Sequence, residues 1–245
     1  RTCQRARAPL QPARKGKRTK KSVSDDATAK ARHNAYGKTE MWYLVGADRD
    51  AELIMGFNKD TDKSEYLTAL HNHTLPVLLN TEKVEKGDCF FIPAGTVHAI
   101  CKGCYIAEIQ QTSDITYRIY DYDRRDKNGN PRELHTELAT DVINFCEQKQ
   151  HSIHYHQHEN HTEELVSCNY FTTNYLKFDK EVEKDYIELD SFVIYMCLEG
   201  NFTLVYDVDK TVKVNKGETI LVPAILKNLF LIPETEAEIL EIYIR

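Results

Sequence analysis

Two residues in the first half of the chain carry side chains of the kind that bind metal ions. Glu40 lies in the alternating run TEMWYLVGA, where it shares a strand face with Trp42 and Leu44. Because a buried carboxylate is stable only when it is paired or bound to a metal, this position indicates a ligand. His98, in the run VHAI, is the second candidate, and a carboxylate with an imidazole suits Zn²⁺. The long stretch of chain between them makes spacing a weak signal, and a buried structural histidine is the ordinary alternative for His98.

Two basic residues could hold an anionic substrate beside these ligands. Arg118, in the alternating run TYRIY, offers a fixed charge and a bidentate fork that suits a phosphate. Lys38 stands two positions before Glu40, so it shares the same strand face and offers a point charge for phosphate. The sequence has no Gly-rich phosphate loop, so side chains would have to hold such a group. Taken alone, Arg118 is more often a surface ion-pair residue.

Short strands must position these side chains. The stretch from Lys86 to Asp123 begins with a Lys-Gly-Asp turn and continues with apolar runs that Pro93 and Gly95 interrupt. His98 stands where a strand restarts. Further strands are expected over TEMWYLVGA, over residues 51–57 and over TYRIY.

Three helices are expected around the strands. Asp25 and Asp26 predict the start of the first, and residues 60–70 are amphipathic. The third is expected to begin at Asn130, with Pro131 at its first position. Its apolar residues at helical spacing should pack on the strands; they are Leu134, Leu138, Val142 and Phe145.

An internal repeat divides the chain into two similar halves. Placing Val84 on Val214 aligns VEKGDCFFIPAGTVHAI with VNKGETILVPAILKNLF without gaps. A repeat of this length indicates two copies of one supersecondary unit, here a small jelly-roll barrel with many short strands. Asn228 holds the place of His98 in the second copy, so the first copy is expected to carry the chemistry.

Composition limits the broad class of the protein. The 245 residues are 41% hydrophobic and 29% charged, which is ordinary for a soluble globular chain. No run approaches the roughly 18 apolar residues of a membrane span, and no signal peptide follows the basic start. The seven cysteines show no regular framework, which favours reduced thiols and a cytoplasmic location.

Residues 1–24 differ in composition from the rest. They carry nine Lys or Arg and no Asp or Glu, which leaves residues 25–245 near −15 when the whole chain is −6. Such a run cannot bury much apolar surface, so it is expected to be disordered or non-native. A nucleic-acid-binding arm is the functional alternative, which we do not favour.

Several other candidate metal ligands are expected to be structural or solvated. His33 lies in the first expected helix, and His71 and His73 follow the second. Five more histidines fall between residues 151 and 161, where a solvated linker with adventitious metal affinity is expected. Cys101 and Cys104 form a single CxxC, whereas zinc knuckles usually come in pairs.

Three blocks of the sequence resemble one enzyme family. GKTEMWY, FIPAGTVHAI and EIQQTSDITYRIYDYDR, in that order, are similar to the short bacterial form of type I mannose-6-phosphate isomerase. The resemblance extends from about Asp25 to the C-terminus. It implies an all-β double cupin with a few short helices, in which residues 25–150 form the metal-binding catalytic cupin. Residues 151–245 would form a second, degenerate cupin.

The resemblance also implies a function and a site. The family interconverts mannose 6-phosphate and fructose 6-phosphate, an aldose–ketose isomerisation through an enediol(ate). One Zn²⁺ per chain would be bound by Glu40 and His98, with Lys38 and Arg118 serving the substrate and Arg118 also catalysis. The expected partners are these sugar phosphates, without nucleic acid or membrane, and the chain would be a monomer or weak dimer.

One family motif is missing. Members carry a Gln-x-His-Pro motif before an Asp pair, whereas this chain has Lys21 and Val23 nearest the places of the Gln and the His. An incomplete ligand set predicts little bound zinc and impaired isomerase activity for this chain. The alternative function is therefore a non-catalytic bicupin that binds a sugar phosphate.

Overall fold

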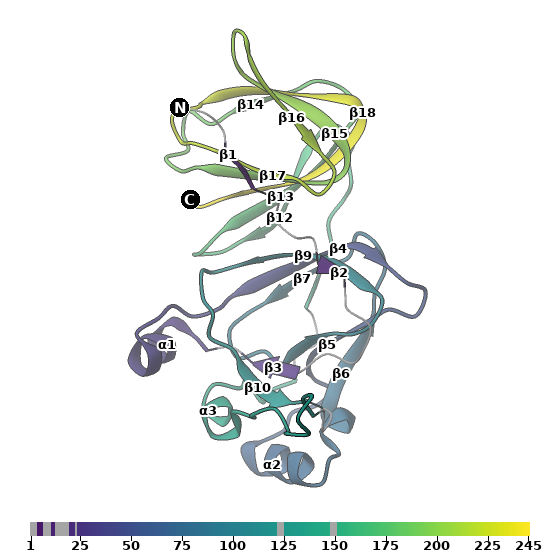
Figure 1. The fold of residues 1–245 in the computed structure, drawn as a ribbon, viewed down its shortest axis with the longest axis vertical. Helices are drawn as coiled ribbons and strands as arrows, with labels where there is room; N and C mark the ends of the chain where they lie inside the picture. The colour runs from purple at the N-terminus through teal and green to yellow at the C-terminus, as the bar shows by residue number, and fades with distance from the viewer. Residues whose placement is uncertain (1–3, 7–10, 13–19, 23, 122–124, 148–150) are drawn as a thin grey trace. The chain divides into compact units, whose positions relative to one another are not determined.

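The computed structural model describes residues 4–6, 11–12, 20–22, 24–121, 125–147 and 151–245 (Figure 1). The chain divides into two compact units, which we call the first unit, residues 11–153, and the second unit, residues 154–245 with β1 (Gln4–Ala6). Both consist mainly of strands, so the predicted all-β class with a few short helices is confirmed. Within the basic segment, residues 4–6, 11–12 and 20–22 lie in strands, and its other residues up to 19, with Val23, lie outside the described residues.

The first unit is built from two five-stranded sheets. One has the order β10-β3-β8-β5-β6, and the other has the order β11-β7-β4-β9-β2. The strands are β2 (Gln11–Pro12), β3 (Lys20–Ser22), β4 (Glu40–Ala47), β5 (Glu52–Phe57), β6 (Leu79–Lys83), β7 (Cys89–Ile92), β8 (His98–Ile100), β9 (Cys104–Gln110), β10 (Tyr117–Tyr120) and β11 (Ser152–Ile153). The helices are α1 (Asp26–His33), α2 (Lys63–His71), the 3₁₀ turn η1 (Leu75–Leu78) and α3 (Thr136–Thr140). Figure 1 shows the two sheets as facing layers, with α2 and α3 on the outer side of the β10-β3-β8-β5-β6 sheet.

Alternation along the strands creates two cores in this unit. The core between the sheets joins side chains of both, among them Trp42, Leu53, Met55, Phe90 and Ile100. The intervening residues of β5, β8 and β10 face the other way and pack with α2, η1 and α3; they include Ile54, Ala99 and Ile119. A residue that shares a face with Trp42 or Met55 therefore points into the space between the sheets.

The first helix begins where the Asp pair predicts, and the helix expected over residues 60–70 is observed as α2, from Lys63 to His71. Asp25 caps α1 by accepting a hydrogen bond from the backbone N–H of Thr28 at 2.7 Å, and Asp62 caps α2 through the N–H of Glu65 at 2.8 Å. The strand predictions over Glu40–Ala47 and Glu52–Phe57 are also confirmed.

The prediction for the third helix was wrong in its start and its packing. The Asp126 carboxylate accepts the backbone N–H groups of Asn128 and Asn130, and Arg125 forms a β-bridge with Pro131, so this segment is a tight turn. Helix α3 begins only at Thr136 and has five residues. Leu134 and Leu138 are consequently exposed, at 40% and 38%, while Val142 and Phe145 do pack against the core.

The second unit is one eight-stranded sheet with the path β1-β17-β15-β18-β13-β12, to which β14 and β16 add at the side. Its remaining strands are β12 (Thr162–Ser167), β13 (Thr172–Phe178), β14 (Val182–Asp185), β15 (Val193–Asp207), β16 (Lys210–Asn215), β17 (Thr219–Val222) and β18 (Asn228–Tyr243). Its core contains the two aromatic pairs Phe178–Phe202 and Tyr195–Phe202.

The internal repeat is confirmed in three dimensions. Strands β7 and β17 occupy the same place in the two copies, and each follows a turn whose glycine has a positive φ, 95° at Gly87 and 81° at Gly217. The Gly87 N–H donates to Leu44 O at 2.8 Å, and the Gly217 N–H donates to Cys197 O at the same distance. Glycine is favoured at both turns because other residues are strained at such a φ.

The equivalence of His98 and Asn228 fails in space. Asn228 is exposed, and the next residue, Leu229, is fully buried in the core of the second unit. The two strands are therefore out of phase by one position, which exchanges the inward and outward faces. Leu229, and not Asn228, occupies the inward position that His98 holds in the first unit.

Candidate active site

Strand β4 begins with a buried ion pair. Glu40 is 1% exposed and Lys38 is 9% exposed, and Lys38 Nζ lies 2.9 Å from Glu40 Oε1. The two atoms lie within hydrogen-bond distance, but their orientation does not suit a hydrogen bond. Among the described residues, Glu40 Oε1 therefore has no hydrogen-bond partner. The Lys38 ammonium is the cation beside this buried oxygen, so the ion pair compensates its charge although the hydrogen bond is not formed.

Strand β8 turns the imidazole of His98 toward this carboxylate. His98 Nδ1 lies 3.0 Å from Thr96 O, an acceptor, which assigns the ring proton to Nδ1 and leaves the lone pair on Nε2. Nε2 lies 4.0 Å from Glu40 Oε2, beyond hydrogen-bond distance, and the ring meets Trp42 edge-on at 5.3 Å. Burial lowers the pKa of His98; Glu40 opposes this shift, and Lys38 and Lys21 add to it. A neutral imidazole with its other nitrogen held by a carbonyl is suited to bind a metal.

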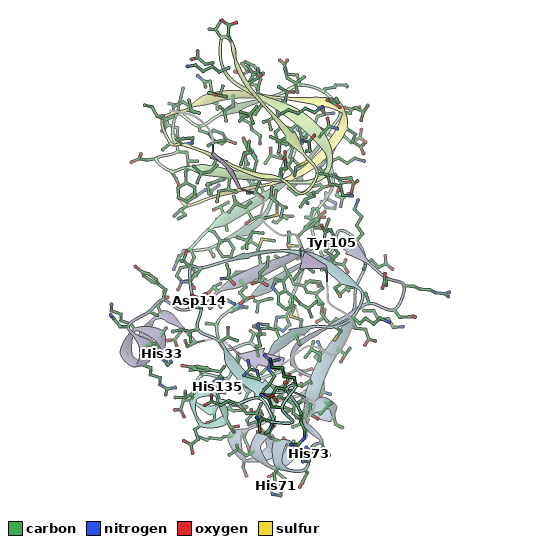
Figure 2. All side chains as sticks on the ribbon, viewed as in Figure 1. His33, His71, His73, Tyr105, Asp114 and His135 are labelled. Atoms are coloured by element: carbon green, nitrogen blue, oxygen red, sulfur yellow. The ribbon has the colours of Figure 1, made fainter. Side chains whose placement is uncertain are left out.

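Arg118 and His98 lie in one row across three strands. On the strand between them, Lys21 pairs directly with Arg118 on one side and with His98 on the other. Directly paired residues share a face, so all three point toward the space between the sheets. The Arg118 guanidinium donates to Glu133 O at 2.8 Å, and its backbone N–H donates to His135 Nδ1 at 2.9 Å. Figure 2 shows His135 beside β10, where these contacts hold the strand to the segment before α3.

Glu108 is a site residue that the sequence reasoning missed. It stands directly opposite Trp42 in the β4–β9 pair, so it faces the same interior as Glu40. Burial and then the Glu40 charge raise the pKa of Glu108, while Lys38, Lys21 and the Trp42 indole oppose the increase. The side chain still contacts solvent, which a group that exchanges protons with a substrate needs. The signal was available, because CYIAEIQ alternates and puts a carboxylate on an apolar face, as at Glu40.

The donors present do not complete a zinc site. Glu40 and His98 meet as predicted, but the described residues contain no group of three His, Cys, Asp or Glu that could hold a metal ion. Catalytic zinc sites use three protein ligands and structural sites use four. Two ammonium groups, of Lys38 and Lys21, act on these donors instead, and Val23 lies outside the described residues. Within the described part of the chain, two zinc donors are therefore present, and the charges of two lysines act on them.

Most of the other histidines are solvated, as predicted. His33 is exposed and lies 2.8 Å from the Tyr117 hydroxyl, and His71 and His73 are exposed at the end of α2 (Figure 2). The histidines of the linker cluster that are exposed are His154, His156, His158 and His161.

The prediction of a solvated linker was wrong for His151. This residue is 6% exposed and belongs to the first unit, because its carbonyl accepts the Phe91 N–H at 3.1 Å as an extension of β11.

The CxxC pair has an ordinary structural place. Cys104 is buried in the core between the sheets, where its thiol donates to Glu52 O.

Comparison with known proteins relates the chain to sugar-phosphate isomerases. No family model matches the sequence. The chain is 37% identical over 189 residues to mannose-6-phosphate isomerase ManA of Bacillus subtilis, covering 76% of this chain and 59% of that protein. It is 44% identical over 119 residues to mannose-6-phosphate isomerase of Streptococcus mutans, covering 49% of this chain and 37% of that protein. The chain thus spans less than two thirds of the length of these curated relatives.

Solved structures of similar proteins share the fold. The crystal structure of the mannose 6-phosphate isomerase from Bacillus subtilis matches with a TM-score of 0.81 and 32% identity, over 92% of this chain and 70% of that one. Phosphomannose isomerase from Salmonella typhimurium matches with a TM-score of 0.71 and 13% identity, over 94% of this chain and 76% of that one. These matches confirm the predicted double-cupin fold.

Proposed function

Since this chain belongs to the mannose-6-phosphate isomerase family, we propose that its first unit binds mannose 6-phosphate and interconverts it with fructose 6-phosphate. The observation that carries this proposal is the cluster between the two sheets. It brings a carboxylate with a raised pKa, Glu108, next to a second carboxylate, Glu40, and to the ammonium groups of Lys38 and Lys21. An aldose–ketose isomerisation requires a proton carrier and positive charge close together.

Glu108 is the proposed proton carrier. It would take the proton from C2 of mannose 6-phosphate to give an enediolate and return a proton to C1, while the hydroxyl proton of O2 passes to O1, which gives the ketose. A carboxyl whose pKa is raised above the ordinary value for glutamate is a stronger base than an unperturbed one, and the same group can return the proton that it has taken.

The positive side chains have separate proposed roles. Lys38 lies at the buried end of the cluster beside Glu40, where it would stabilise the enediolate oxygens. Arg118 is half-buried at the far end of the row that contains His98, and its bidentate fork suits the phosphate or an enediolate oxygen.

Zinc remains a separate proposal. Glu40 and His98 are the residues that would bind it, and a bound zinc ion would supply Lewis-acid polarisation of the sugar oxygens. Two protein ligands do not complete such a site. The roles given to Glu108, Lys38 and Arg118 therefore do not depend on it.

A coupled assay of the purified chain tests the function. Mannose 6-phosphate should be converted to fructose 6-phosphate slowly but above the uncatalysed rate, and neutral mannose should react at least tenfold more slowly, because the cationic residues select a charged substrate. Equal conversion of both sugars would contradict the phosphate-binding role. No conversion after long incubation would contradict the proposed activity.

Substituting Arg118 with lysine tests its geometry apart from its charge. Lysine keeps the positive charge but lacks the fork, so kcat/KM for mannose 6-phosphate should fall at least tenfold. The matched control is Arg125→Lys, because Arg125 is exposed and donates to Gly129 O in the 126–130 turn. An unchanged kcat/KM in Arg118→Lys would remove Arg118 from the site.

A second candidate function is favoured by the incomplete ligand set. With two metal ligands among its described residues and several cations beside them, the first unit could bind a sugar phosphate without converting it. Saturable binding of mannose 6-phosphate by calorimetry, with no turnover in the coupled assay, would establish this alternative.

A monomeric or weakly dimeric state and a cytoplasmic location stay predictions for either function. No described helix is long and apolar enough to cross a membrane.

A further inference from the structure

The two units can be compared position by position through their shared hydrogen bonds. The Leu44 N–H donates to Asp88 O at 2.8 Å in the first unit, and the Cys197 N–H donates to Glu218 O at 3.0 Å in the second. Strand β4 therefore corresponds to the beginning of β15. Trp42 corresponds to Tyr195, since they pair with equivalent positions of the repeat in β7 and β17.

A glutamate stands opposite this aromatic residue in both units. Trp42 pairs with Glu108 on β9, and Tyr195 pairs with Glu241 on β18. The two metal-ligand positions differ, because Glu40 corresponds to Val193 and the inward place of His98 is taken by Leu229. The glutamate opposite the aromatic residue is thus common to both units, while the metal ligands are not.

In the second unit a buried lysine neutralises this glutamate. Lys184 is 8% exposed and Glu241 is 2% exposed, and Lys184 Nζ lies 3.0 Å from Glu241 Oε1. Lys184 also donates to Thr162 Oγ1 at 2.7 Å, and the Tyr186 hydroxyl donates to the same carboxylate. The interior of the second unit therefore holds a cation that belongs to the chain itself.

Lys21 has the corresponding place in the first unit. Lys21, on β3, pairs directly with His98 on β8. In the same way Lys184, on β14, pairs directly with Leu229 on β18. Because of its pairing, Lys21 shares the face of the sheet on which His98 lies, and its charge lowers the pKa of both His98 and Glu108. Unlike Lys184, Lys21 remains exposed to solvent, so a ligand can approach it.

We propose that Lys21 is the internal cation of the first unit, equivalent to Lys184 of the second, and that it makes this interior a site for an anionic sugar oxygen while disfavouring a divalent metal. The choice of a sugar ligand rests on the proposed function. The physical reason is that a positive charge on the residue paired with His98, which also acts on Glu108, repels a second cation at these donors and attracts an anion.

Cobalt titration tests the metal half of this proposal without requiring turnover. Co²⁺ bound by carboxylate and imidazole is followed by its visible absorption in the wild type and in Lys21→Met, which should bind at least tenfold more tightly. Lys21→Arg, which keeps the charge, should bind as weakly as the wild type. The control is Lys83→Met, since Lys83 is exposed on β6 of the same sheet and should have no effect.

Stoichiometric, tight Co²⁺ binding by the wild type, or equal affinities in the wild type and Lys21→Met, would overturn the proposal. Lys21→Gln repeats the measurement if Lys21→Met does not fold, as judged by circular dichroism. A failed isomerase assay leaves these affinities unaffected, so the two ideas can fail separately.

Calorimetry tests the anion half. With a chelator present, the wild type should bind mannose 6-phosphate, and Lys21→Gln should bind it at least tenfold more weakly, with Lys83→Met unchanged. Equal binding by Lys21→Gln and the wild type would show that Lys21 does not serve an anionic ligand. Inorganic phosphate, titrated in parallel, separates recognition of the phosphate group from recognition of the sugar oxygens.

Discussion

Substituting Glu108 with glutamine should lower kcat for mannose 6-phosphate by about 10² to 10⁴, the range typical for loss of a positioned general base. KM should change much less, because glutamine keeps the shape and hydrogen-bonding capacity of the side chain. Glu82→Gln is a matched control, since burial also raises the pKa of Glu82 but its partner is Asn80 on β6. A kcat within threefold of the wild type in Glu108→Gln would exclude the proposed role.

The pH dependence gives a second measurement on the same residue. A base works when it is deprotonated, so kcat/KM should fall as the pH drops through the pKa of Glu108, which lies above the ordinary value for glutamate. Burial and the charge of Glu40 raise this pKa, and the charges of Lys38 and Lys21 lower it. In Lys21→Gln the acidic limb should therefore move to higher pH. A shift to lower pH, or no acidic limb in the wild type, would contradict the assignment.

Substituting Lys184 with methionine should destabilise the second unit by about 3–5 kcal/mol, because it leaves the Glu241 carboxylate buried without its cation. The double substitution Lys184→Met with Glu241→Gln should recover more than half of this loss, since no uncompensated charge is then buried. The exposed pair Lys213–Glu234 provides the control, and Lys213→Met should leave the free energy of unfolding nearly unchanged.

Two probes separate the units in this experiment. Trp42 is the single tryptophan of the chain and lies in the first unit, so its fluorescence reports unfolding of that unit. Circular dichroism reports both units. In Lys184→Met the unfolding curve followed by circular dichroism should show an additional transition at lower denaturant concentration. The transition followed by Trp42 fluorescence should keep its midpoint. A single transition at the wild-type midpoint would show that the pair does not stabilise the second unit.

The pattern of the sequence determined features that depend on local periodicity and turn chemistry. Alternation placed Glu40, Trp42 and Leu44 on one face of β4, and the cap at Asp25 placed the start of α1. The gapless internal repeat predicted two similar units, because such a match preserves turns and strand lengths together. These signals lie within short stretches of the chain, so the sequence displays them directly.

The tertiary structure alone decided which strands face each other. The distance between Glu108 and Lys21 in the sequence gives no hint that they share an interior, because they face it from separate strands in opposite sheets. Burial of His151 likewise depends on its alignment with β7. The inward position falls at Leu229 and not at Asn228 because the strand phase differs by one position. Since the side-chain period of a strand is two, a slip of one position exchanges the buried and exposed faces, and only the three-dimensional pairing shows which face is inside.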